Sequence, residues 1–217
     1  MSNKLPLVVL ISGSGSNLQS IIDAAASDLP VEIKAVISNK TEAYGLERAR
    51  TAGIETRVLD HKEFPDRDSY DHALGDLIEE YQPGLVILAG FMRILTPALV
   101  NRFHGRMLNI HPSLLPKYRG LHTHQRALEA GDKIHGATVH FVTEELDGGP
   151  LIIQAQVPIL EQDDSDTLAA RVLKQEHTIY PLAIRMFAQG ELRMEESVVY
   201  HQERRLASPI MVDTTGN

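Results

Sequence analysis

Short apolar runs alternate with amphipathic stretches along the first half of the chain. Apolar runs of this length predict buried strands, and apolar residues that recur every three or four positions predict helices. The predicted strands are residues 7–11, 33–38, 56–59, 85–89 and 107–110, and the predicted helices are residues 18–26, 43–52 and 67–81. Such alternation implies right-handed crossovers, and it predicts an α/β fold with a doubly wound, mostly parallel sheet and helices on both faces.

The pattern changes after Gly120. Beyond that point the predicted elements are a helix at residues 121–130, paired strands at 137–142 and 151–157, and a long helix at 165–188. Pro181 should kink the long helix. From Gly190 onward the chain is polar, and its end shows no pattern. Because no repeat, low-complexity tract or linker divides the chain, we expect a single domain.

Composition narrows the class of protein. The chain has 217 residues, 43% of them hydrophobic, and a net charge of −8. This acidic balance argues against a general nucleic-acid surface, although a local cationic pocket remains possible. The absence of Cys excludes disulfides, thiol nucleophiles and Cys metal sites. Since neither a signal peptide nor a membrane span is apparent, we expect a cytoplasmic protein.

The turn after the first predicted strand reads SGSGSN, residues 12–17. A Gly-rich turn that opens a helix places backbone amides at a helix N-terminus, where an anion can bind. A dinucleotide fingerprint would need a third Gly at Leu18 and an acid at the end of the second strand, where Lys40 stands nearby. The pattern therefore favours a phosphate monoester over a dinucleotide, with a simple tight turn as the other interpretation.

The fifth predicted strand ends in Asn109, Ile110 and His111, and Pro112 follows directly. Residues two apart on a strand point to the same side, so Asn109 and His111 project together at a carboxyl end, where open α/β sheets bind ligands. An Asn can donate to a developing oxyanion and a His can supply a proton, which suits acyl transfer. Alternatively, both side chains tie down the following loop, and the sequence leaves these two interpretations equal.

A carboxylate, Asp147, stands in the turn ELDGGP. It could make an ordinary Asx-turn, or it could orient His111 and complete an Asn, His and Asp trio. Ser113 lies outside any nucleophile-elbow pattern, so direct attack by the substrate fits better than a covalent intermediate. Although the chain has 10 His residues, no zinc spacing occurs, so we expect no metal and expect histidines that make hydrogen bonds.

Glu176 falls on the apolar stripe of the long predicted helix, between Val172 and Ile179. A buried carboxylate costs several kcal/mol unless it has a partner. The stripe therefore predicts either an ion pair with Arg or Lys, or a contact with a polar ligand.

Several motifs, taken in order, resemble the phosphoribosylglycinamide formyltransferase family, the folate-dependent glycinamide ribonucleotide transformylases. The motifs are VVLISGSGSNLQSIIDA, VISNK, YGLERA, LAGFMRILTP, LNIHPSLLPKYRGLHTH, HGATVHFV, ELDGGPLI and KQEHTIYP, which fall within residues 7–192. This resemblance implies transfer of the formyl group of 10-formyltetrahydrofolate to the amine of glycinamide ribonucleotide in de novo purine biosynthesis. It also implies a Rossmann-like domain over residues 1–217, with a nucleotide-binding half at about 1–110, a folate and catalytic half at about 111–192, and a tail at 193–217.

The resemblance assigns roles to matching positions. The implied catalytic residues are Asn109, His111 and Asp147. The implied ribonucleotide-binding residues are Gly15, Ser16, Asn17, Lys174, Gln175 and Glu176. The implied folate-binding residues are Arg67, Met92, Arg93, Ile94, Leu95, Asn109, Thr143, Glu144, Glu145, Leu146 and Asp147. Leu173 has no hydrogen-bonding side chain, so no side-chain role is implied there, and Arg119 stands in a loop position that varies among members.

Relatives that share the same trio define the alternatives. A formyltetrahydrofolate deformylase has a His where Pro112 stands and an additional regulatory domain, and a tRNA-acting formyltransferase has an RNA-binding domain. A sugar-nucleotide formyltransferase and a non-catalytic folate- or nucleotide-binding module are the remaining alternatives. The expected partners are small-molecule substrates, without nucleic acid or membrane, and the expected assembly is a monomer or a homodimer.

Overall fold

The computed structural model describes residues 4–212 and divides into two compact units, Met1–Asn109 and Ile110–Asn217. The division falls inside strand β5, Met107–His111. The predicted α/β class is confirmed, because a mostly parallel sheet alternates with helices along the chain.

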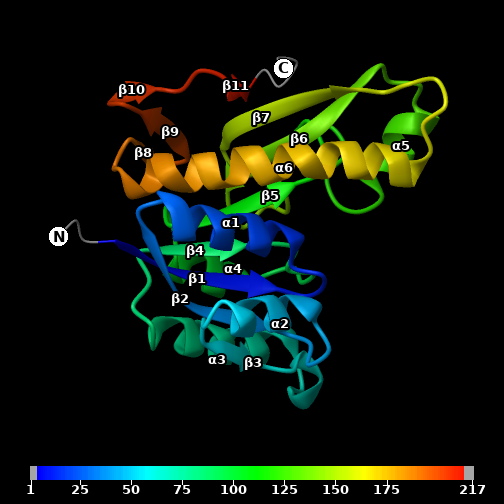
Figure 1. Ribbon diagram of the computed structural model, residues 1–217. Coiled ribbons are helices and arrows are strands. Elements are labelled where there is room, and N and C mark those ends of the chain that lie inside the picture. Colours follow the sequence, from blue (N-terminus) through cyan, green and yellow to red (C-terminus); the bar gives the residue numbers. More distant parts are fainter. Residues whose placement is uncertain (1–3, 213–217) are drawn as a thin grey trace. The chain divides into compact units, whose positions relative to one another are not determined.

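The first unit is a parallel sheet whose strand order is β3-β2-β1-β4-β5. Its elements are β1 (Leu5–Ile11), α1 (Ser16–Ser27), β2 (Val31–Ser38), α2 (Tyr44–Thr51), β3 (Thr56–Val58), the 3-10 turn η1 (His61–Glu63), α3 (Arg67–Glu79), β4 (Leu85–Leu88), α4 (Pro97–Arg102) and β5 (Figure 1). Both faces of such a sheet are covered, which explains why β4 is an unbroken apolar run. The strand order reverses between β1 and β4, and open sheets bind ligands at such a switch point, beyond the carboxyl ends of the strands.

Sequence signals at the helix ends explain where α3 and α4 begin. The Asp66 side chain caps α3 by accepting the Ser69 amide at 2.8 Å. Helix α4 was not predicted, because it is a short element, yet its start carries two recognisable signals. Pro97 occupies the first turn, and the Thr96 hydroxyl accepts the Leu99 amide at 3.3 Å.

The second unit contains a helix-covered pair of antiparallel strands. Its elements are α5 (Thr123–Glu129), β6 (Ile134–Phe141), β7 (Leu151–Pro158), α6 (Ser165–Ala188), β8 (Leu192–Glu195), β9 (Val198–His201), β10 (Arg204–Arg205) and β11 (Ile210–Val212). Strands β6 and β7 pair as predicted, and α6 packs along both of them (Figure 1). Helix α6 starts at a capping box and continues through Pro181.

No strand was predicted after Gly190, where the sequence showed only a polar segment, but the described residues there form strands. Strands β8, β9 and β10 form an antiparallel sheet, and β11 extends the other sheet by pairing in parallel with β7. Both hairpin turns have positive φ at two successive residues, Glu196 and Ser197 in one and Gln202 and Glu203 in the other. Such turns usually contain Asn or Gly, so this sequence lacked the usual hairpin signal. Residues 213–217, where the predicted irregular end falls, lie outside the described residues.

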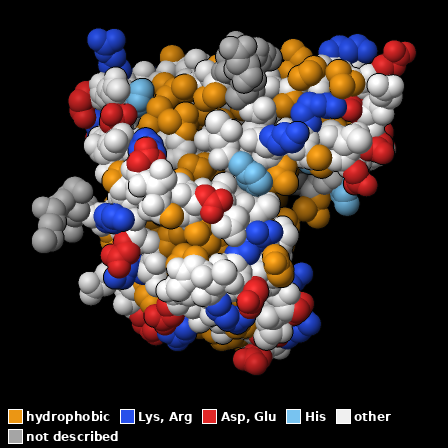
Figure 2. Space-filling view, in the orientation of Figure 1, with side chains coloured by type: hydrophobic (Ala, Val, Ile, Leu, Met, Phe, Trp, Pro, Cys, Tyr) orange, Lys and Arg blue, Asp and Glu red, His pale blue; other side chains and the backbone are white. Residues whose placement is uncertain are grey.

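Within residues 4–212, no helix is long and apolar enough to cross a membrane. Acidic and basic side chains are interspersed on the face of the molecule seen in Figure 2.

Candidate active site

The Gly-rich turn of the first unit has the geometry of an anion site. Gly15 is the N-cap of α1 and adopts a left-handed conformation, with φ of 71°. The amides of the first helical turn have no acceptor within a helix, and the helix dipole makes this end positive. No acidic side chain stands in the first turn of α1. The turn can therefore accept an anion without competition from a carboxylate of its own helix.

Helix α2 supports this turn from behind. The Gly45 amide donates to the Gly13 carbonyl at 3.0 Å, and the Arg48 Nε donates to the Ser14 carbonyl at 2.8 Å. A Cβ added to Gly15 would lie 2.5 Å from the Gly45 Cα, closer than real Cβ contacts. Both the backbone conformation and the close approach of α2 thus require glycine at position 15.

The predicted folate residues of the first unit lie on α3 and on the segment after β4. Arg67 is the first residue of α3 and is exposed. Met92 and Ile94 are 65% and 54% exposed, whereas Leu95 is buried. The Arg93 guanidinium lies 4.5 Å from the centroid of the Tyr70 ring, a cation–π contact. The segment therefore exposes two apolar side chains, Met92 and Ile94, while Leu95 is buried.

His111 and Asp147 meet in the second unit, as the candidate trio required of them. His111 Nδ1 lies 3.4 Å from Asp147 Oδ2, and both side chains are buried. His111 Nε2 lies 2.8 Å from the Tyr118 carbonyl, which can only accept, so Nε2 carries a proton. The remaining ring nitrogen, Nδ1, faces the Asp147 carboxylate.

Asn109 lies on β5, two residues before His111. It is half-buried on β5 and pairs in register with Leu88 of β4. Since it stands two residues before His111 on the same strand, the two side chains project from the same side. The joint action of Asn109 and His111 stays a prediction.

The turn that carries Asp147 is shaped by its own glycines. Asp147 has φ of 48°, a conformation that Asp tolerates better than most residues. A Cβ on Gly149 would collide with the Phe141 carbonyl oxygen. The Asp147 Oδ2 also accepts the Gly120 amide at 2.8 Å. The sequence DGG thus serves to bring the carboxylate to His111 and to the loop that follows it.

The other predicted folate residues of this turn are more exposed. Glu144, Glu145 and Leu146 are exposed and Thr143 is half-buried. Glu145 forms an ion pair with Arg119, so these two side chains tie the turn to the loop after β5.

His140 is a site residue that the sequence interpretation missed. It is buried on β6, and its Nε2 lies 3.8 Å from Asp147 Oδ1. Its Nδ1 lies 2.8 Å from the Phe141 carbonyl, so Nδ1 donates. Burial lowers the pKa of His140, which keeps this ring neutral. Asp147 therefore lies between two imidazole rings, those of His111 and His140. The sequence feature that could have identified His140 is a polar residue near the end of a predicted buried strand.

The predicted ribonucleotide residues of α6 differ in exposure. Lys174 is exposed, and Glu176 is buried on the apolar stripe as predicted. The Gln175 Oε1 atom is buried and has no hydrogen-bond partner among residues 4–212. An acceptor left without a partner inside a protein is costly, so a ligand that donates to it would be stabilised. Residues 15–17 and 174–176 belong to different compact units, and their joint role stays a prediction.

Two further histidines of the second unit, His124 and His135, hydrogen-bond to each other. His135 Nε2 lies 3.2 Å from His124 Nδ1, and burial lowers the pKa of His135 to about 4. In the described part of the chain, no group of three or more His, Asp or Glu side chains is arranged to hold a metal ion.

Comparison with known proteins identifies the family. The formyl transferase family matches residues 5–184. Phosphoribosylglycinamide formyltransferase of Escherichia coli K12 is 57% identical over 201 residues, which cover 92% of this chain and 95% of that protein. A solved phosphoribosylglycinamide formyltransferase from Coxiella burnetii has a TM-score of 0.93 at 51% identity, covering 96% of this chain and 99% of its own. Glycinamide ribonucleotide transformylase 1 from Symbiobacterium toebii has a TM-score of 0.89 at 46% identity, covering 93% and 95% of the respective chains. The chain belongs to the formyl transferase family.

Proposed function

We propose that this protein transfers the formyl group of 10-formyltetrahydrofolate to the amine of glycinamide ribonucleotide, a step of de novo purine biosynthesis. The formyl transferase family uses formyl-folate as a co-substrate. The observation that carries the choice of acceptor is the identity of 57% over 95% of the E. coli protein, whose name states that acceptor. The buried contact between His111 and Asp147 supplies a chemical rationale.

The chemistry assigned to the site is direct attack. The neutral amine attacks the formyl carbon, and negative charge gathers on the formyl oxygen. Asn109 and a doubly protonated His111 donate hydrogen bonds to that oxyanion. In the structure His111 Nε2 donates to the Tyr118 carbonyl. The oxyanion replaces this carbonyl as the acceptor, and Asp147 stabilises the second proton on the ring.

Bond breaking completes the transfer. As the tetrahedral intermediate collapses, the bond between the formyl carbon and the folate nitrogen breaks. The attacking amine loses one proton and the departing folate nitrogen gains one. Asp147 assists this movement through water, as a general acid and base would. No covalent intermediate on the protein is required.

Binding is assigned to two sets of residues. The phosphate of the ribonucleotide binds the amides of residues 15–17, and residues 174–176 bind the rest of the ribonucleotide, with Glu176 toward the ribose hydroxyls. The folate binds Arg67, residues 92–95, Asn109 and residues 143–147. The N-terminal turn of α1, without an acid of its own, supports the phosphate assignment.

The proposal includes the expectations that no metal takes part, that the protein is a monomer or a homodimer, and that it works in the cytoplasm. The first can be tested directly, because a chelator should leave the rate of transfer unchanged. Loss of activity with a chelator, restored by one added metal, would overturn it.

The deciding experiment is turnover of purified protein, followed by the absorbance change as 10-formyltetrahydrofolate loses its formyl group. Turnover should require glycinamide ribonucleotide. Equal turnover with water alone would identify a deformylase, and turnover only with an amino-sugar nucleotide would identify a sugar-nucleotide formyltransferase. Absence of turnover with every acceptor would identify a binding module.

A further inference from the structure

The segment formed by residues 91–96 is held at both of its ends by buried polar side chains that belong to other elements. We propose that Ser12 and Asp71 are positioning residues, which clamp this segment in the conformation that binds the folate. The inference rests on the proposed function, since it assigns a role to residues that touch a substrate-binding segment. Neither residue carries a role in the chemistry described above.

Ser12 holds the beginning of the segment. Its hydroxyl accepts the Met92 amide at 2.8 Å and donates to Asn39 Oδ1 at 2.5 Å. Ser12 and Asn39 are 4% and 2% exposed, respectively. Because the hydroxyl is used both as donor and as acceptor, its orientation is fixed. Ser12 follows β1 and Met92 follows β4, so this contact joins the two strands at the switch point of the sheet.

Asp71 holds the end of the segment. Its Oδ2 accepts the Thr96 amide at 2.6 Å. Asp71 is 1% exposed, and burial raises the pKa of its carboxyl group. Its Oδ1 has no hydrogen-bond partner among the described residues. A buried carboxylate with one unsatisfied oxygen is a costly choice for stability alone.

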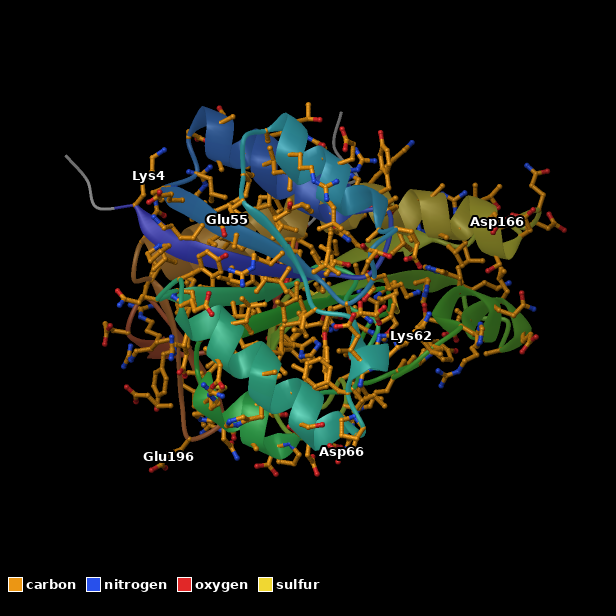
Figure 3. All side chains as sticks on the ribbon, turned by 90° about the horizontal axis from the view of Figure 1, so that it is seen from below. Lys4, Glu55, Lys62, Asp66, Asp166 and Glu196 are labelled. Atoms are coloured by element: carbon orange, nitrogen blue, oxygen red, sulfur yellow. The ribbon has the colours of Figure 1, made fainter. Side chains whose placement is uncertain are left out.

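The middle of the segment is held by the neighbour of Asp71. The Arg93 guanidinium lies over the Tyr70 ring. On α3, Tyr70 and Asp71 come three and four residues after Arg67. Residues with these spacings share one face of a helix. Figure 3 labels Asp66 at the N-terminal end of this helix. One face of α3 therefore joins the predicted folate residue Arg67 to the predicted folate segment.

The clamp determines which side chains the segment presents. Phe91 and Leu95 are 8% and 9% exposed, whereas Met92 and Ile94 between them are 65% and 54% exposed. An unsupported loop would lose conformational entropy when a ligand ordered it. A segment that is already ordered avoids this loss, so the clamp should act on the affinity for folate.

Asp71→Ala leaves the buried Thr96 amide without its acceptor. We expect the KM for 10-formyltetrahydrofolate to rise about tenfold, while the KM for glycinamide ribonucleotide and kcat stay within about twofold. Asp71→Asn keeps an oxygen for the Thr96 amide, so its folate KM should stay within about threefold of wild type. This rescue by the conservative variant separates positioning from a need for charge.

Two further variants make the test specific. Asp76→Ala is a matched control on the same helix, because Asp76 pairs with Arg102 of α4 at 2.8 Å and stands away from the clamp. It should lower stability without changing either KM. Ser12→Ala removes the clamp from the other end and should also raise the folate KM about tenfold. If Asp71→Ala does not fold, Ser12→Ala and Asp71→Asn decide the question.

Amide hydrogen exchange on the unliganded proteins tests the clamp without reference to any substrate. The Thr96 amide should exchange faster in Asp71→Ala than in wild type, and the Met92 amide faster in Ser12→Ala. Folded variants with wild-type folate KM, or an equal rise of both KM values, would overturn the positioning role. Wild-type protein that fails to transfer formyl groups would instead overturn the proposed function, and unchanged exchange at Met92 and Thr96 would then overturn the clamp itself.

Discussion

Asp147 Oδ2 lies 3.4 Å from His111 Nδ1 and at the same time accepts the Gly120 amide at 2.8 Å. One carboxylate oxygen thus serves the ring and the loop after the strand. Because the other His111 nitrogen donates to Tyr118 in that same loop, ring, carboxylate and loop form one hydrogen-bonded unit. A change at Asp147 should therefore affect chemistry before it affects binding.

Asp147→Asn should lower kcat on the order of 10²-fold and change either KM much less. The amide oxygen can still accept from Gly120, so the loop contact survives while the charge beside His111 is lost. Single-turnover transfer measures the chemical step, and nitrogen chemical shifts of the ring report its protonation at neutral pH. A variant whose His111 ring and rate both match wild type would show that Asp147 is only a structural turn residue.

Asn109→Ala and His111→Ala should each lower kcat by roughly 10²–10³-fold, the usual cost of removing one oxyanion donor. The double variant should lose less than the product of the two single losses, since both groups act on one charge. Steady-state kinetics with both substrates varied provides the numbers. Losses that multiply fully would mean that the two side chains serve separate steps.

Gly15→Val should raise the KM for glycinamide ribonucleotide by tenfold or more and leave the folate KM nearly unchanged. A β-branched side chain cannot adopt φ of 71° without strain, and its Cβ would collide with Gly45. Gly53→Val is the matched control, because Gly53 has the same φ but no atom within 4 Å of an added Cβ. If both variants lose stability equally and neither changes the ribonucleotide KM, the phosphate assignment is wrong.

Acid should destabilise the protein through His135. Burial holds the pKa of His135 at about 4 in the folded chain, below the usual 6.5 of an unfolded chain. The unfolded state therefore binds more protons between these values, and stability falls as pH drops through this window. From pH 7 to pH 5 the contribution of His135 is a loss of about 2 kcal/mol in the free energy of unfolding.

Urea unfolding at pH 7 and at pH 5 measures this loss in the free energy of unfolding. In His135→Gln the difference between the two pH values should be smaller by most of the roughly 2 kcal/mol assigned to His135. The effect of Asp163 can be distinguished from that of His135 by pH. The ion pair with Arg171 holds the pKa of Asp163 at about 2. Stability from Asp163 is lost only below about pH 4, outside the tested interval. A variant with the wild-type dependence between pH 7 and pH 5 would exclude His135 as the source.

The sequence alone determined the order and type of most elements and several site candidates. Apolar runs located β1, β2, β4 and β5, because a strand covered on both faces consists mostly of apolar side chains. The placement of Asn109 and His111 at a strand end followed from the period of two along a strand. Glu176 was found by its violation of a helical apolar stripe, and it is buried as expected.

Only the tertiary structure decided which of these residues meet. The approach of Asp147 to His111 depends on a left-handed residue, and on a glycine that lets the turn approach Phe141. The second imidazole, His140, reaches Asp147 from another strand, and Asp71 reaches Thr96 across the first unit. Local periodicity reports which side of an element a residue occupies. It carries no information about the partner across a gap in sequence, because that contact forms only when the sheet is assembled.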